Sequence, residues 1–175
     1  MIVSTVDSVL CHRDGEGIRT FPSVKSRLLS FEQEIVFINN GGNYAYRLWC
    51  EELELNGEMP RTDPRILPAS AADVRQELEN IISGIMGKEY PLLVSYAWAE
   101  TYRDGGIKAG GIIPPDERDN PAWSLDWRLP DTGMLRQVCT MFEVAPESII
   151  FVTASPDGIR AARSAGMEWL HPLEL

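Results

Sequence analysis

The sequence predicts an α/β fold in which a short parallel sheet is covered by helices on both faces. Short, continuously apolar segments such as 35–38 have the composition of strands buried on both sides. Longer segments such as 74–85 repeat apolar residues at helical spacing. The two kinds of segment alternate along the chain, which favours parallel strands joined by right-handed crossovers. A length of 175 residues without an internal repeat fits one domain spanning 1–175.

The individual elements follow from local signals. Ser70 begins a helix as an N-cap and Gly87 ends it, while Thr132 caps a helix through Phe142 and Gly166 ends the last one. Strands are expected at 2–6, 34–39, 91–98, 148–153 and 168–170, and helices at 24–29, 44–55, 71–86, 133–142 and 157–165. Turn-forming residues predict a loop or hairpin tip at 13–17, a connector at 57–69 and a long irregular insertion at about 98–128.

Composition narrows the classes of partner. A net charge of −10 argues against nucleic acid and anionic membrane surfaces, both of which attract basic proteins. We find no apolar run long enough to span a bilayer and no basic, apolar leader, so a cytoplasmic location is expected. Cys11, Cys50 and Cys139 are far apart and lack CxxC spacing, which predicts reduced thiols rather than a zinc site or a disulfide.

The strand order predicts where a site would lie. In open α/β sheets ligands bind at the carboxyl ends of the strands. Several polar or small residues fall at such ends: Thr5, Asp7, Asn39, Thr153, Ala154 and Ser155.

Four segments at these positions resemble the signature motifs of the haloacid dehalogenase (HAD) superfamily of phosphohydrolases. They are 2–10, 35–42, 129–135 and 149–167. The third resembles the Lys-Pro-x-Pro-Gly-Met motif of the histidinol-phosphate and heptose-bisphosphate phosphatase branch. The resemblance implies a three-layer, HAD-like (Rossmannoid) domain with a short parallel sheet and no large cap.

The same alignment implies that most chemical groups of the family are replaced. Thr5 stands at the position of the nucleophilic Asp, and Asp7 at that of the general acid/base. Asn39 stands at the phosphoryl-binding position, Leu129 at that of the lysine and Ala154 at that of a metal-binding Asp. A threonine hydroxyl is a poor nucleophile without a base, and Mg²⁺ prefers anionic oxygen ligands. No catalytic residue and no cofactor are therefore expected, with Mg²⁺ implied only if residual activity exists.

Two carboxylates leave alternatives open. Asp157 is either a substitute metal ligand or the N-cap of the helix that follows it. Asp7 is either a metal-site or catalytic group or a structural hydrogen-bond acceptor.

Three functions are compatible with these residues. The first is a catalytically degenerate module for interaction or regulation, which would use the aromatic insertion at 98–128 to bind a protein partner or a second copy. The second is a phosphate or small-molecule binder, and the third is a phosphohydrolase with rearranged chemistry. The candidate ligand-binding residues are Thr5, Asp7, Asn39, Asn40, Arg128 and Ser155.

The insertion is bracketed by aromatic residues, which either bind a partner or pack the insertion onto the sheet. They are Tyr96, Trp98, Tyr102, Trp123 and Trp127. Loops longer than about 12–15 residues are usually either functional or disordered. Of these two outcomes we predict the first, an ordered and functional insertion. Trp98 and Trp127 are expected to pack against the body while the outer face contacts a partner.

Overall fold

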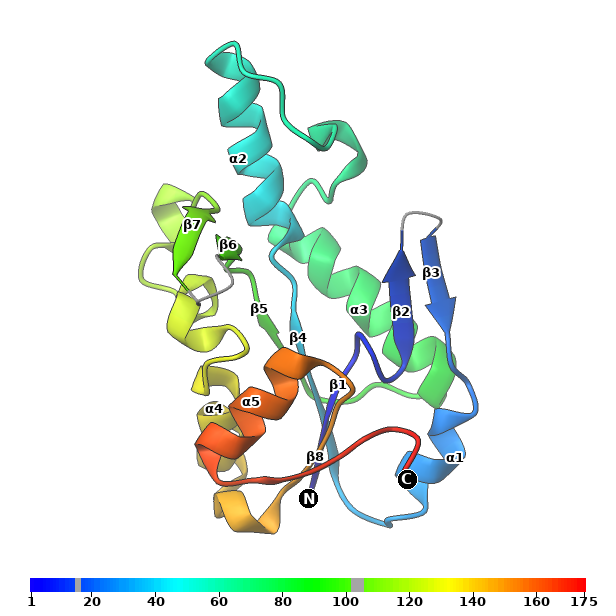
Figure 1. Ribbon diagram of the computed structural model, residues 1–175. Coiled ribbons are helices and arrows are strands. Elements are labelled where there is room, and N and C mark those ends of the chain that lie inside the picture. Colours follow the sequence, from blue (N-terminus) through cyan, green and yellow to red (C-terminus); the bar gives the residue numbers. More distant parts are fainter. Residues whose placement is uncertain (15–16, 102–105) are drawn as a thin grey trace.

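A computed structural model describes residues 1–14, 17–101 and 106–175, and its centre is a five-stranded parallel sheet (Figure 1). The strand order is β5-β4-β1-β8-β9. The strands are β1 (Ile2–Thr5), β4 (Ile35–Asn40), β5 (Leu92–Ser95), β8 (Ile150–Val152) and β9 (Glu168–Leu170). The helices are α1 (Val24–Leu29), α2 (Asn43–Leu55), α3 (Ala71–Met86), α4 (Gly133–Phe142) and α5 (Pro156–Ala165).

Alternate residues of the central strands enter two hydrophobic clusters on opposite faces of the sheet. Ile2 and Phe37 pack with α1 and α3 on one face, and Val3 and Val36 pack with α4 and α5 on the other. This arrangement gives the three layers that the sequence predicts. Within the described residues, no helix is both long enough and apolar enough to cross a bilayer.

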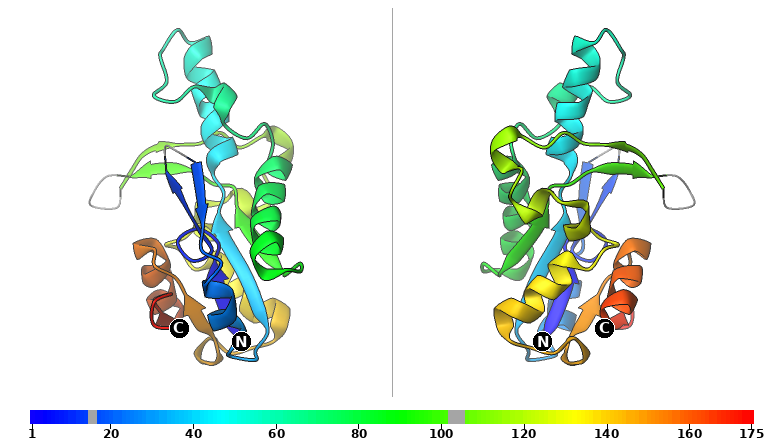
Figure 2. Two further views of the ribbon diagram at one scale, coloured as in Figure 1. Left: turned by 90° about the vertical axis from the view of Figure 1, so that its right-hand side faces the viewer. Right: turned by 90° about the vertical axis from the view of Figure 1, so that its left-hand side faces the viewer.

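Two hairpins and α2 extend from the end of the sheet where the parallel strands finish (Figures 1 and 2). One hairpin pairs β2 (Cys11–Asp14) with β3 (Gly17–Thr20), and the other pairs β6 (Ala99–Thr101) with β7 (Ile107–Gly110). The strands on both sides of the expected hairpin tip at 13–17 pair with each other, as a hairpin requires. Residues 15–16 themselves lie outside the part of the chain that the structure describes. No larger cap is found among the described residues.

The structure confirms the residues predicted to begin α3 and to end α3 and α5. The Ser70 side chain accepts a hydrogen bond from the Asp73 backbone N–H. Gly87 and Gly166 follow α3 and α5 with φ of 83° and 73°, a conformation that glycine adopts without steric cost. The Thr132 prediction was wrong in its detail, because Thr132 precedes α4 but its side chain makes no capping hydrogen bond.

The insertion is more regular than the sequence predicts. Besides the β6–β7 hairpin it contains three short 3-10 helices, Pro115–Glu117, Pro121–Trp123 and Leu125–Trp127. Trp98 packs on two aromatic rings of α2, and Trp127 packs on the cluster beneath α4 and α5. Both packing predictions are therefore confirmed, whereas Tyr102 lies outside the described residues. The strand expected at 91–98 ends earlier, at Ser95.

Candidate functional site

The ends of β1 and β8 bring hydroxyl groups together at the centre of the sheet. Thr5 Oγ1 donates to Thr153 Oγ1 at 3.3 Å and is hydrogen-bonded to Ser8 Oγ, also at 3.3 Å. Ser8 has a φ of 73°, uncommon for a residue with a side chain, and its hydroxyl also accepts from the Ala154 N–H at 3.3 Å. Thr5 is only 3% exposed. The side chain at the nucleophile position thus lies inside a hydroxyl network made by the chain itself.

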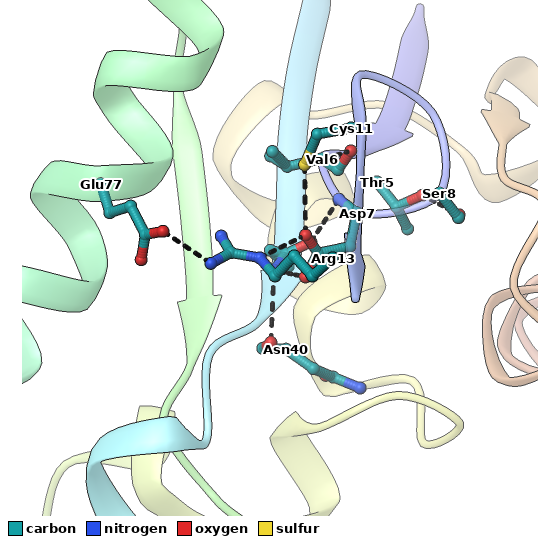
Figure 3. Close-up of polar contacts among 9 residues, drawn as sticks. Thr5, Val6, Asp7, Ser8, Cys11, Arg13, Asn40 and Glu77 are labelled. Carbon is teal, nitrogen blue, oxygen red and sulfur yellow. Dashed lines mark hydrogen bonds and ion pairs between the residues drawn. The ribbon is translucent and has the colours of Figure 1, made fainter. Parts of the chain in front are cut away.

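Asp7 is held by groups from β4 and β2, and one of these groups, Arg13, also contacts α3 (Figure 3). The Asn39 amide at the end of β4 donates from Nδ2 to Asp7 Oδ2 at 2.8 Å and accepts from the Asp7 backbone N–H at 2.9 Å. Arg13 of β2 donates from Nε to Asp7 Oδ1 at 2.8 Å and from one terminal nitrogen to Glu77 of α3 at 2.8 Å. The Cys11 thiol donates to Asp7 Oδ1 at 3.3 Å. The carboxylate that the resemblance places in the acid/base role therefore accepts hydrogen bonds from three side chains of the protein itself.

The surroundings of this network raise the pKa of Cys11 and that of Arg13. Burial, followed by the nearby Asp7 charge, raises the pKa of Cys11 to about 12, so the thiol stays a neutral donor at neutral pH. Burial acts to lower the pKa of Arg13, but the charges of Asp7 and Glu77 outweigh it, so the pKa is raised. The arginine remains a cation between two carboxylates.

Asn40, next to Asn39 on β4, fixes the segment that carries the lysine position. Its side-chain amide donates to the Leu129 carbonyl at 3.1 Å and accepts from the Leu129 N–H at 3.0 Å. The Leu129 side chain is 3% exposed and belongs to the core cluster of α4 and α5. At the position where the resemblance implies a lysine, the chain therefore has an apolar side chain that is buried in the hydrophobic core.

The residues present do not fit the divalent metal that the resemblance implies. Thr5 and Ala154 offer no carboxylate, and Asp7 is engaged by Arg13 and Asn39. The resemblance also aligns Gly158 with a second acidic residue of the fourth motif, but Gly158 has no room for a side chain, because an added Cβ would lie 2.5 Å from the Thr153 hydroxyl oxygen. In the part of the chain that the structure describes, no three His, Cys, Asp or Glu side chains form a group that could hold a metal ion.

Arg128 and Asp157 lie apart from this network, at a separate pocket of about 260 Å³. Arg160 also lines the pocket and forms an ion pair with Asp157. Arg128 Nε is buried, and its guanidinium forms no hydrogen bond or ion pair among the described residues. Burial lowers the pKa of Arg128, and the Asp157 charge only partly opposes this. Asp131 also lines the pocket, so two arginines and two aspartates surround it, and Arg128 is the arginine that has no hydrogen bond or ion pair among the described residues.

The start of α5 corrects the assignment made for Asp157. The N-cap is Ser155, whose hydroxyl accepts from the Gly158 N–H at 3.4 Å, and Pro156 occupies the first turn. Asp157 points instead to Arg160, one turn further along the helix. The Ser155 hydroxyl therefore has a capping role, while the Ser155 backbone N–H joins the Thr5 network by donating to Thr153 Oγ1 at 3.1 Å.

Sequence reasoning brought Thr5, Asp7 and Asn39 to one end of the sheet but missed Ser8, Arg13 and Glu77. Arg13 and Glu77 are 64 positions apart and meet only because the β2–β3 hairpin lies beside α3. The one feature of the sequence that could have predicted the role of Arg13 is its position shortly after Asp7, as a positive residue following a carboxylate at a strand end.

Comparison with known proteins shows similarity in structure but not in sequence. No protein-family model matches the chain, and no curated protein is significantly similar to it in sequence. A D,D-heptose 1,7-bisphosphate phosphatase from B. bronchiseptica, solved with magnesium and phosphate, superposes with a TM-score of 0.52 at 14% identity. That match covers 96% of this chain and 77% of the phosphatase.

Two further solved structures have lower scores. A protein described as a HAD-like phosphatase from Mesorhizobium loti has a TM-score of 0.49 at 16% identity, covering 95% of this chain and 68% of that one. A HAD-like protein of unknown function from Agrobacterium tumefaciens has a TM-score of 0.34 at 16% identity, covering 96% and 80%. The first superposition shows a likeness in fold, and the five-stranded parallel sheet is consistent with it. The chain has the three-layer α/β fold of the haloacid dehalogenase superfamily.

Proposed function

We propose that this protein does not hydrolyse phosphate esters and acts as an interaction or regulatory module built on a phosphohydrolase fold. The observation that carries the proposal is the state of Thr5, which is buried and hydrogen-bonded to two other hydroxyl groups at the nucleophile position. A cytoplasmic setting is part of the same proposal.

The chemistry of the neighbouring groups supports it. A phosphoaspartyl mechanism needs a carboxylate nucleophile, and a threonine hydroxyl needs a base to act in its place. Asp7 is the acidic group of this network closest in sequence to Thr5, and its oxygens accept from Arg13, Asn39 and Cys11. Without a cation at Leu129, the charge that develops on a transferred phosphoryl group would lack a stabilising partner.

The test is hydrolysis of an aryl phosphate by the purified protein in the presence of Mg²⁺, with an active HAD phosphatase as positive control. We expect no rate above the blank, and the Thr5→Asp variant should also be inactive because the lysine and metal ligand remain absent. Turnover that disappears both with a chelator and in Asp7→Asn would overturn the proposal.

The Arg128 pocket favours a second candidate function, binding of a small anion without turnover. Its volume of about 260 Å³ lies just below the usual range of ligand pockets, and its walls include the apolar side chains of Leu125, Leu129 and Ile107. Asp131 and Asp157 also line the pocket, but the Arg128 guanidinium has no hydrogen-bond partner among the described residues, so its donors are free for a small carboxylate or phosphate.

This second candidate is tested by calorimetric titration with inorganic phosphate and with small carboxylates. Arg128→Met should abolish any binding heat, whereas Arg118→Met, at an exposed position elsewhere in the insertion, should not. Equal heats from the two variants would exclude the pocket.

A further inference from the structure

The far end of α2 is a protruding, acidic and apolar tip (Figure 1). Leu55 is 88% exposed and Met59 is 96% exposed, which is unusual for large apolar side chains close together. Glu54 and Glu58 are exposed beside them and form no ion pair among the residues that the structure describes. We call Glu54, Leu55, Glu58 and Met59 the arm tip.

The first half of α2 forms one wall of a hollow of about 410 Å³. Trp98, just before β6, packs against two rings of α2, with centroid distances of 4.6 Å to Tyr46 and 5.3 Å to Trp49. The rest of the wall comes from Arg61, Glu100, Lys108 and Ala109. We call these residues the aromatic hollow.

The hollow carries an excess of positive charge in a protein whose net charge is −10. A single oxygen, Glu100 Oε1, lies 3.3 Å from Lys108 Nζ and 3.6 Å from an Arg61 nitrogen. One carboxylate therefore faces two cations, and the Arg61 side chain is 82% exposed. The potential of the hollow favours an anionic partner.

We propose that the arm tip of one copy docks into the aromatic hollow of a second copy. The two surfaces are complementary: the tip is convex, apolar and acidic, and the hollow is concave, aromatic and cationic. Methionine makes favourable contacts with aromatic rings, and Trp, Tyr and Arg are enriched at the energetic centres of interfaces. The inference rests on the proposed function, since it names the partner of the interaction module.

The arm tip does not occupy the hollow of its own chain in the structure. Leu55 follows Tyr46 by nine residues, which places it on the opposite side of the helix and about 13 Å further along its axis. Leu55 and Met59 are accordingly absent from the walls of the hollow. Because tip and hollow are different surfaces, the contact is heterologous, and association runs from copy to copy.

The experiment measures molar mass by light scattering across a wide range of protein concentrations. The wild-type protein should increase in mass with concentration, and added salt should weaken association because it screens the charges. Leu55→Glu/Met59→Glu, which alters the tip, and Arg61→Glu/Lys108→Glu, which alters the hollow, should each reduce self-association by about tenfold or more. Leu173→Glu, an equally exposed apolar position outside both surfaces, should associate like the wild type.

Mixing the two altered proteins gives the decisive result. Each retains one intact surface, so the mixture should form dimers and nothing larger. A wild-type protein that stays monomeric at every concentration, association that persists in both variants, or a mixture that stays monomeric would each overturn the docking proposal.

The failure of this inference is distinguishable from failure of the proposed function. If the protein is monomeric and has no phosphatase activity, only the docking proposal is wrong. If the protein self-associates as expected but hydrolyses phosphate esters, only the proposal of an inactive site is wrong.

Discussion

The crevice at the strand ends, a hollow of only about 10 Å³ whose lining includes Asp7, Arg13 and Asn39, differs from the insertion beside it in how its polar groups are satisfied. In the crevice, Thr5, Asp7 and Asn39 all have hydrogen-bond partners within the chain. Four buried side-chain polar atoms lack a partner within the described residues, and three of them belong to the insertion: Trp123 Nε1, Trp127 Nε1 and Arg128 Nε. The fourth is Ser95 Oγ, at the end of β5.

This difference indicates where new contacts are available. A buried polar group that already has partners gains little from a ligand, whereas an unpartnered one carries an energetic cost that a ligand or an ordered water can relieve. The polar side chains of Thr5, Asp7 and Asn39 at the strand ends already have such partners. The insertion contains the unpaired guanidinium of Arg128, and the end of α2 exposes large apolar side chains.

The largest expected effect tests whether the crevice is sealed by the hydrophobic core. Leu129→Lys places a charge at a side chain that is 3% exposed among apolar residues, so we expect a loss of about 3 kcal/mol or more in unfolding free energy. Leu129→Met, which keeps the volume, should cost less than about 1.5 kcal/mol. Chemical denaturation measures both, and a stable Leu129→Lys protein would show that this position opens to solvent.

An intermediate effect tests the ion-pair network around Asp7. Arg13→Met keeps the apolar stem but removes the contacts to Asp7 and Glu77, whose side chains are 38% and 36% exposed. Because solvent screens these groups in part, we expect a cost of about 1–2 kcal/mol. Arg136→Met, at an exposed position of α4, is the control. Equal stability of the two variants would mean that the network contributes nothing to folding.

The sequence predicted the sheet, its helices and the gathering of Thr5, Asp7 and Asn39, because these depend on local hydrophobic patterns and on the rule that parallel strands end at one edge. The hairpin β6–β7 was not predicted, since its strands are short and exposed and leave no buried alternation. Arg13 and Glu77 were missed because their contact depends on the placement of a hairpin against a distant helix. The Ser155 cap was available from the sequence, since Pro156 at the first helical position marks the residue before it.

The smallest expected effect gives the most direct comparison of the two regions. Arg128→Met removes a guanidinium that makes no hydrogen bond or ion pair among the described residues, and it retains an unbranched apolar stem. Burial of this unpaired cation is unfavourable, so the substitution should leave the unfolding free energy within about 0.5 kcal/mol of the wild type or raise it slightly. Arg13→Met in the crevice should lose stability under the same denaturation conditions. If Arg128→Met is instead the more damaging of the two, the guanidinium is stabilised by its surroundings, and the pocket it lines is structural rather than a place for a ligand.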